Sequence, residues 1–337
     1  MPLSRIVNGP TAAMAGNETS RETESADTPR RRVRVAVVQA GSILFDTARS
    51  LEKLADLTAD AARQKAELVV FPEAFIGGYF KGHDFGVSVG IRSREGRDAF
   101  RRLFDNAVEA PGPATEFIGK VVREHGVHAV VGVIERDGGT LYCTALIFGS
   151  DGSLLGKHRK LMPTAMERVI WGSGDGSMLP VVPTAVGRIG SVICWENYMP
   201  LLRTAMYARQ IELYCALTVD DRETWLPTVT HIALEGRCFV LSACQILRRA
   251  DLPADYPTVR FPESQDLLIR GGSCIVGPLG HLLAGPSYGE ECILTADLDL
   301  TDLARAKFDF DVVGHYARPD VFCLEVNEQP MKSVRFQ

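Results

Sequence analysis

Cys194 stands in the stretch SVICWENYMP, between an apolar, β-branched run and a helix-forming segment. A turn at such a junction can lift the sulfur out of a sheet, much as a nucleophile elbow lifts a serine. Backbone N–H groups at the turn and at the start of the helix would stabilise a thiolate and, later, an anion forming on a substrate. This setting favours a nucleophilic role for Cys194, whereas the other seven cysteines are most simply small buried hydrophobes.

A cysteine nucleophile usually needs a base. None of the seven histidines stands in an arrangement that marks a Cys–His pair, so a carboxylate is the other option. Glu73 ends the run LVVFPE, at the exit of an expected buried strand. A carboxylate there either caps the following turn or lies in the crevice where open α/β sheets hold their ligands. Glu73 could therefore take the thiol proton, and a structural role is equally compatible with its position.

A second polar cluster lies in GKHRKLMPTAMERVIWGSGDGS. Lys160 and Glu167 flank a Pro-led segment that can turn both side chains toward one cleft. Lys160 would hold developing negative charge there, and Glu167 would fix the lysine. Lys157, His158 and Arg159 are also compatible with an ordinary solvated basic stretch. No GxxxxGK[ST] pattern occurs, which excludes a Walker phosphate-binding loop.

Short β-branched runs alternate with helical patterns, as is typical of an α/β domain. The first units are a strand at 33–39, a helix near 46–65 and the strand AELVVFPE. Residues 128–158 then predict three consecutive antiparallel strands, because RDGGT and SDGS supply the glycines of tight turns. Alternation resumes with the strand RIGSVICWE and with helices near 198–209 and 222–236. The remaining strand-like runs are IELYCALTV, CFVLSACQ, GSCIVGP, HLLAG and ECILTADLD.

Composition excludes several classes of partner. The chain has 337 residues, and its 37 basic and 42 acidic residues give a formal charge of −5, which offers no general attraction to nucleic acid or to an anionic membrane. No apolar run approaches the roughly eighteen residues of a membrane span. The eight cysteines include no CxxC pair, as expected of a reduced cytoplasmic protein, and no metal site is expected.

The sequence has no linker that would divide it in two, so one domain is expected. Residues 1–32 are rich in Ser, Thr, Gly and charge and are expected to form a disordered leader. The acidic residues of this segment argue against a transit peptide. The domain is expected over residues 33–325, followed by a short C-terminal tail at 326–337.

Three segments, FPEAFIGGY, GKHRKLMPTAMERVIWGSGDGS and GSVICWENYMPLLR, together resemble the nitrilase branch of the carbon–nitrogen hydrolase superfamily. The resemblance extends to GIRSREGRDAFRRL, VDDRETWLPTVTHIALEGRCFVLSACQ and GHYARPDVF, and so covers about residues 33–325. It implies an α/β fold, a four-layer αββα sandwich. It also implies a homodimer that pairs helices near 198–236 into an eight-layer arrangement and builds to a higher homo-oligomer. The catalytic residues that it implies are Glu73, Lys160 and Cys194, with Glu167 as a second glutamate.

The activity implied by the resemblance is hydrolysis of a small organic nitrile to the carboxylic acid and ammonia. Cys194 would form a thioimidate that Lys160 and a backbone N–H near Trp195 stabilise, and water would convert it to a thioester and then to the acid. Some amide could leave instead, and no metal or organic cofactor takes part. The alternatives are an amidase or carbamoylase with the same triad, and a catalytically silent assembly protein.

Two positions depart from the usual nitrilase pattern. Tyr79 is followed by Phe80 where proline is common. Leu217, in the run Ala216-Leu217-Thr218, replaces the proline of a common Ala-Pro-Thr run. Without the proline the backbone regains an N–H and the loop is freer, while Phe80 adds bulk. Both positions therefore bear on substrate size and on the ratio of acid to amide.

Aromatic side chains are expected to shape the substrate pocket. Those expected to bind substrate are Tyr79, Trp171, Trp195 and Tyr198, and Trp225 is a further candidate for the pocket wall. Rings of this size bury a large apolar surface, so a place in the core is the alternative for Trp171, Tyr198 and Trp225.

Overall fold

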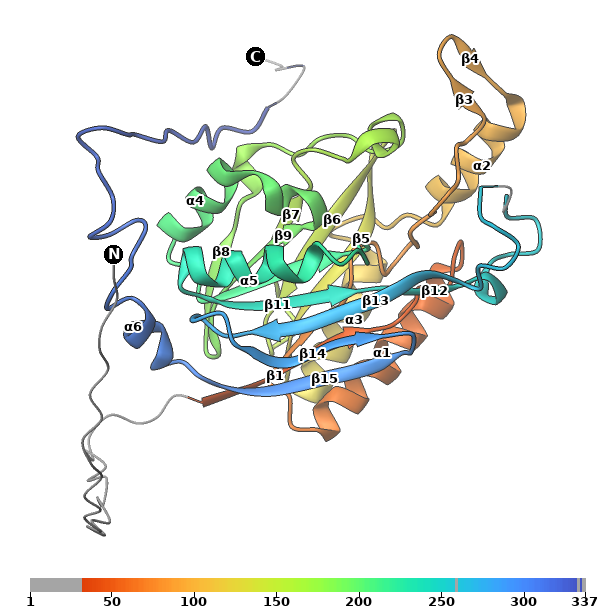
Figure 1. The fold of residues 1–337 in the computed structure, drawn as a ribbon. Helices are drawn as coiled ribbons and strands as arrows, with labels where there is room; N and C mark the ends of the chain where they lie inside the picture. The colour runs from red at the N-terminus through yellow and green to blue at the C-terminus, as the bar shows by residue number, and fades with distance from the viewer. Residues whose placement is uncertain (1–31, 258–259, 332–333, 335–337) are drawn as a thin grey trace, which may run out of the picture. The chain divides into compact units, whose positions relative to one another are not determined.

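The computed structural model describes residues 32–257, 260–331 and 334 (Figure 1). Of the leader expected over residues 1–32, all but Arg32 lies outside the described residues. Over the described part of the chain, no helix is both long and apolar enough to cross a membrane.

Two β-sheets pack face to face, and the side chains of β1 (Arg32–Gln39) show why. Val35 and Val37 enter the core between the sheets, whereas Ala36 and Val38 enter a second core beneath helices. Successive side chains of a strand point to opposite faces, so a strand buried on both faces needs a continuous apolar run. The run VAVV therefore fits a strand in the interior of a layered fold.

The first sheet has six strands. In spatial order they are β15 (Cys292–Asp299), β1, β2 (Leu68–Val70), β5 (His128–Asp137), β6 (Thr140–Phe148) and β7 (Leu154–Arg159). β1, β2 and β5 are parallel neighbours. β5, β6 and β7 form the antiparallel run predicted for residues 128–158, which is confirmed.

The second sheet has seven strands. Six of them lie in the order β12 (Ile246–Arg248), β13 (Leu267–Val276), β11 (Phe239–Cys244), β10 (Leu213–Thr218), β9 (Gly187–Ile193) and β8 (Val181–Thr184), and β14 (Leu282–Tyr288) pairs with β13. β9, β10 and β11 are parallel, so their carboxyl ends meet at one edge. A short hairpin of β3 (Val87–Ser88) and β4 (Ile91–Arg92) stands apart from both sheets (Figure 1).

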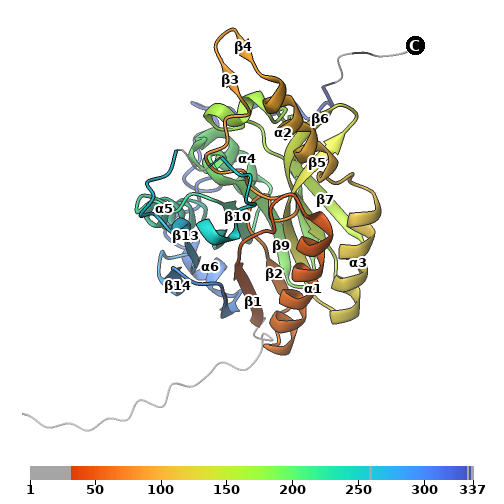
Figure 2. The ribbon, with the colours of Figure 1, turned by 90° about the vertical axis from the view of Figure 1, so that its right-hand side faces the viewer.

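Helices cover the outer face of each sheet. The α-helices of the described chain are α1 (Thr47–Arg63), α2 (Arg94–Asp105), α3 (Pro113–His125), α4 (Pro200–Ala208), α5 (Trp225–Gly236) and α6 (Asp302–Ala306). α1 and α3 lie side by side on the first sheet (Figure 2), and α4 and α5 cover the second. The order helices, sheet, sheet, helices confirms the predicted αββα sandwich.

The helices predicted from the sequence are α1, α4 and α5, each slightly shorter than expected. α2, α3 and the β3–β4 hairpin fall in a stretch for which the sequence predicted no element. α3 nevertheless carries two local signals: Pro113 in its first turn, and Gly126 at its end with a left-handed φ of 64°. Those signals mark where the helix begins and ends.

The directions of the strands bring together the polar residues that follow them. β7 is antiparallel to β6 and β6 to β5, so β7 points the same way as β5 and β2. Glu73 follows β2 and Lys160 follows β7, so both leave the first sheet at the same edge. In the second sheet Cys194 follows β9 and Thr218 ends β10. The two edges adjoin, because Gln245 after β11 donates from its side chain to the carbonyl oxygen of Glu73 at 2.6 Å.

Candidate active site

Cys194 occupies a strained turn between β9 and the 3₁₀ helix η3 (Cys194–Tyr198). Its φ of 51° is left-handed, which costs a non-glycine residue roughly 1–2 kcal/mol. The side-chain amide of Asn197 holds the turn by donating to the carbonyl oxygens of Cys194 at 2.8 Å and Val192 at 3.2 Å. The turn places Cys194 in the lining of a cavity.

Lys160 and Glu73 form a buried ion pair beside this cysteine. Neither side chain is exposed, and Lys160 Nζ donates to Glu73 Oε1 at 2.8 Å. Cys143, from β6, also donates to Glu73 Oε1, with its sulfur 3.5 Å away. Glu73 Oε2 receives no hydrogen bond of normal geometry from any described residue. Because Oε1 already accepts two hydrogen bonds, Oε2 is the oxygen left to accept a further proton.

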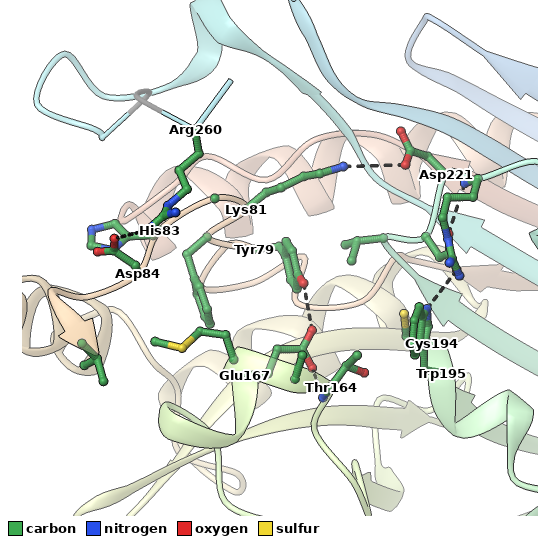
Figure 3. A pocket seen from close by; sticks show the side chains of 18 residues that line it. Tyr79, Lys81, His83, Asp84, Thr164, Glu167, Cys194, Trp195, Asp221 and Arg260 are labelled. Carbon is green, nitrogen blue, oxygen red and sulfur yellow. Dashed lines mark hydrogen bonds and ion pairs between the residues drawn. The ribbon is translucent and has the colours of Figure 1, made fainter. Parts of the chain in front are cut away.

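Glu167 is the second carboxylate around Lys160. It lies in the 3₁₀ helix η1 (Ala165–Val169), and its Oε2 accepts from Lys160 Nζ at 2.8 Å and from the backbone N–H of Thr164 at 2.7 Å. Its Oε1 accepts from the hydroxyl of Tyr79 at 2.8 Å, as Figure 3 shows. Lys160 is therefore held between two carboxylates and cannot turn away from either without breaking an ion pair.

Burial and ion pairing set the protonation of these groups. Burial raises the pKa of Glu73, and the positive charge of Lys160 offsets only part of that rise. Burial alone would lower the pKa of Lys160, but the acidic groups around it, of which Glu73 has the largest effect, outweigh burial and raise that pKa well above its usual value. Burial also raises the pKa of the Cys194 thiol. The resting site therefore holds a neutral thiol, an ammonium group and a glutamate that is more basic than an exposed one.

Thr218, the last residue of β10, donates its hydroxyl to Cys194 Sγ at 3.2 Å. The hydroxyl oxygen accepts from the backbone N–H of Asp220 at 2.9 Å, which leaves its proton for the sulfur. This hydrogen bond favours the thiolate and so opposes the effect of burial on the pKa of Cys194. The sequence predicted no role for Thr218 or Cys143; the available signal for Thr218 was its place at the exit of the strand beside β9.

A cavity of about 670 Å³ opens onto Cys194. Tyr79, Glu167 and Trp195 line it, and Figure 3 shows all three together with Cys194. Apart from Glu167, which pairs with Lys160, the acidic residues of the lining pair with its lysine and arginines. The pairs are Lys81 with Asp221 at 3.6 Å, Arg222 with Asp220 at 2.5 Å and Arg260 with Asp84 at 2.8 Å. These pairs contribute no excess charge of either sign to the cavity.

Two of the residues predicted to bind substrate, Tyr79 and Trp195, line this cavity. Trp195 is fixed in place, because its Nε1 donates to Asp220 Oδ2 at 2.9 Å and the guanidinium of Arg222 lies 4.7 Å from the ring centroid. Phe80 also lines the cavity, and its ring stacks on that of Tyr79 with centroids 5.6 Å apart. The departure from proline at this position therefore alters the cavity wall itself.

The other aromatic residues lie outside the lining. Trp171 is buried, and its ring centroid lies 5.6 Å from Lys160 Nζ, close enough for a cation–π contact with the ammonium group. Tyr198 is 41% exposed on the surface, and Trp225, the first residue of α5, is buried in the core. Leu217 is fully buried between the sheets. Direct contact of these four side chains with a substrate would require the cavity to change shape.

The sequence profile of the carbon-nitrogen hydrolase family matches residues 34–308. The chain therefore belongs to the carbon–nitrogen hydrolase family. A solved structure of a carbon–nitrogen hydrolase from Helicobacter pylori agrees in fold, with a TM-score of 0.67 at 20% identity over 87% of this chain and 97% of that chain.

Closer relatives specify the branch. An aliphatic nitrilase of Sinorhizobium fredii is 56% identical over 301 residues, which cover 89% of this chain and 97% of the relative. A bifunctional nitrilase/nitrile hydratase of Lupinus angustifolius is 54% identical over 318 residues, which cover 93% of this chain and 91% of the relative. Within the family, the chain falls in the nitrilase branch, as its motifs predicted.

Proposed function

We propose that this protein is a nitrilase that hydrolyses a small organic nitrile to the carboxylic acid and ammonia. The observation that carries the proposal is the convergence of Glu73, Lys160 and Cys194 beside one cavity, although they leave two different sheets. The names of the closer relatives, an aliphatic nitrilase and a bifunctional nitrilase/nitrile hydratase, support a nitrile as the substrate. The paired charges of the cavity lining suit an uncharged substrate of this kind.

The first step joins Cys194 to the substrate. The thiol proton moves to Glu73 Oε2 as the sulfur attacks the nitrile carbon, and one π bond of the C≡N group gives its electron pair to nitrogen. Glu73 then passes the proton to that nitrogen, which leaves a thioimidate. Lys160 and the backbone N–H of Trp195 stabilise the charge that builds on nitrogen. A thiol that is neutral at rest fits this order, because it loses its proton only during the attack.

Water completes the reaction and decides the product. A water molecule, deprotonated by Glu73, adds to the thioimidate carbon and gives a tetrahedral adduct. If the C–N bond breaks, ammonia leaves after its nitrogen has gained both protons of that water, one returned by Glu73 and one from the hydroxyl group of the adduct. A second water then hydrolyses the remaining thioester to the acid. If the C–S bond breaks instead, Cys194 recovers its proton and an amide leaves. Glu167 keeps Lys160 in place through both routes, by the 2.8 Å ion pair.

The proposal is tested by mixing the purified protein with aliphatic, aryl and arylaceto nitriles, and with the matching amides, and measuring ammonia, acid and amide. We expect ammonia and acid from at least one nitrile. Ammonia from amides but from no nitrile would identify an amidase or carbamoylase instead. No turnover of either kind by the folded protein would favour a catalytically silent assembly protein.

The value of kcat/KM is expected to fall as the pH decreases, through an apparent pKa above the usual glutamate value of 4.5. Burial raises the pKa of Glu73, so the protonated, inactive base gains population as the pH falls through that pKa. Since burial also raises the pKa of the Cys194 thiol, no thiolate should form at about pH 7 to 9. A pH profile of kcat/KM checks the first expectation, and the ultraviolet absorbance of thiolate checks the second. Thiolate absorbance at neutral pH that disappears in Cys194→Ala would contradict this assignment.

Phe80→Leu is expected to raise kcat/KM for bulky aryl nitriles relative to short aliphatic ones by about tenfold. The ring of Phe80 lines the cavity and packs against Phe85 and Trp171 with centroids 5.1 Å away in each case, so a smaller side chain leaves room for substrate. Phe148→Leu is the matched control, because Phe148 is buried in a cluster away from the cavity. The control should lose stability and keep the substrate ratio. The same ratio in Phe80→Leu as in the parent would rule out Phe80 as a determinant of substrate size.

We also propose a homodimer in which α4 and α5 of two copies pair to give eight layers, and which builds to a higher homo-oligomer. Leu201 on α4 and Leu234 on α5 support this, because they are 65% and 38% exposed on helices that cover the second sheet. Light scattering of the purified protein should give the mass of a dimer or a larger assembly. A monomer would contradict this part of the proposal.

The remaining proposals concern boundaries and location. We propose one catalytic domain over residues 33–325, flanked by a leader at 1–32 and a tail at 326–337, and the family match over residues 34–308 supports it. We place the protein in the cytoplasm, with no nucleic-acid or membrane partner. The free thiols of all eight cysteines support a reducing compartment.

A further inference from the structure

Glu196, two residues after Cys194, is a buried carboxylate with three donors around it. Its Oε2 accepts from the backbone N–H of Ile193 and from His158 Nε2, both at 2.9 Å. Its Oε1 accepts from the backbone N–H of Leu161 at 2.5 Å. Glu196 is not among the residues that line the cavity, so it acts on a substrate only through its neighbours.

His158 carries a positive charge in this arrangement. Its ring nitrogens both face acceptors, with Nδ1 2.7 Å from the carbonyl oxygen of Met178 and Nε2 2.9 Å from Glu196. A neutral imidazole has a single N–H, so only the imidazolium can donate to both. Burial alone would lower the pKa of His158, but the charge of Glu196 and the two hydrogen bonds outweigh it and raise that pKa. His158 and Glu196 therefore form a fully buried ion pair.

The two backbone groups that Glu196 holds belong to opposite sides of the site. Ile193 directly precedes Cys194 and ends β9 of the second sheet. Leu161 directly follows Lys160, where the chain leaves β7 of the first sheet. One carboxylate thus connects the backbone that carries the nucleophile to the backbone that carries the ammonium group.

We propose that Glu196, backed by His158, is a positioning residue that sets the distance between Cys194 and Lys160 for attack on the substrate. The inference rests on the proposed nitrilase function, in which Lys160 stabilises the charge formed when Cys194 attacks. Because misplacing reacting groups by about 1 Å can cost roughly a hundredfold in rate, the link should affect kcat more than substrate binding. A carboxylate is required, because both of its oxygens accept, whereas an amide turns its NH₂ group toward one of the donors.

Glu196→Gln tests the proposal, because glutamine keeps the size of the side chain and replaces one acceptor by a donor. We expect kcat for nitrile hydrolysis to fall at least about tenfold while KM changes less than about threefold. We also expect iodoacetamide to alkylate Cys194 more slowly, as followed by the mass of the peptide that contains it. A folded variant with kcat and alkylation rate within about twofold of the parent would overturn the proposal.

Glu135→Gln is the matched control. Glu135 in β5 is also a buried carboxylate, and it accepts from side chains: from Thr144 at 2.9 Å, and from Lys157 and Arg159 at 2.6 Å each. We expect it to lose thermal stability like Glu196→Gln but to keep kcat within about threefold of the parent. An equal loss of kcat in both variants would overturn the proposal, because the loss would then follow from removing any buried carboxylate.

His158→Gln is the variant to test if Glu196→Gln does not fold. Glutamine can still donate to Glu196, but the imidazolium charge and the link to Met178 are lost. We expect kcat to fall about fivefold with KM nearly unchanged, and alkylation of Cys194 to slow; unchanged values would overturn the proposal. Alkylation needs no nitrile, so it can be measured even if the protein turns over no nitrile. Absent turnover would then reject the proposed function, and slower alkylation in the variants would still support the positioning role.

Discussion

Replacing Cys194 with alanine is expected to lower kcat for nitrile hydrolysis by at least about 10⁴-fold, because no covalent intermediate can then form. The substitution removes one sulfur atom from a cavity wall, so the fold and the oligomeric size should be unchanged. Steady-state kinetics, circular dichroism and light scattering measure these three quantities. Lost turnover with unchanged size would also separate catalysis from assembly.

Cys215→Ala is the matched control for that variant. Cys215 lies in β10, the strand next to β9, and is as deeply buried as any cysteine of the core. Its thiol makes no contact with the triad among the described hydrogen bonds, so kcat should stay within about twofold of the parent. Equal losses in the two variants would point to a general effect of removing a buried thiol and would contradict the role of Cys194.

Lys160→Met is expected to lower kcat by about 10³-fold or more, because it removes the cation that stabilises charge on the substrate nitrogen. It should also cost about 3–5 kcal/mol in the free energy of unfolding, since two buried carboxylates, Glu73 and Glu167, lose their shared partner. Lys160 lowers the pKa of Glu73, so its removal raises that pKa further. A raised carboxyl pKa gives stability that is lost as the pH rises, so urea unfolding should show a larger deficit at alkaline than at acid pH.

Lys157→Met is the matched control, since it removes an ammonium group from β7, the strand that Lys160 directly follows. The Lys157 side chain pairs with Glu135 at 2.6 Å rather than with the triad. We expect kcat to stay within about threefold of the parent. A similar loss of kcat in both variants would show that any lysine of this strand supports activity indirectly. A Lys160→Met protein with normal kcat would contradict the charge-stabilising role outright.

The polar residues at strand exits could be predicted because their positions conflict with burial. Glu73 and Cys194 directly follow apolar runs, where a polar group is costly unless it has a partner or a function. The prediction of Lys160 and Glu167 as site residues depended more on the resemblance to nitrilases, because a basic run such as HRK is compatible with a solvated surface. The structure brings these four side chains together, and the family match agrees with the motifs. Their catalytic roles stay predictions that the variants above test.

Contacts between distant segments could not be predicted in the same way. Thr218 reaches the site because strand pairing brings β10 beside β9. Cys143 contacts Glu73 although β5 separates β6 from β2 in the sheet. The pair formed by His158 and Glu196 joins residues that a local pattern assigns to a basic run and to a helix start. Trp171 was expected to bind substrate; it is not among the residues that line the cavity, and its ring centroid lies 5.6 Å from Lys160 Nζ. Which side of a buried ring faces a cavity depends on packing between layers, which a local pattern does not specify.

Mass spectrometry of the Cys194 peptide tests covalent catalysis most directly, after the protein is mixed with a nitrile substrate and quenched in acid within one turnover. Attack by this sulfur predicts a mass increase equal to the nitrile for the thioimidate, or to the acyl group for the thioester, and no increase in Cys194→Ala. Turnover with an unmodified Cys194 peptide, or with the same adduct on a different residue, would contradict it.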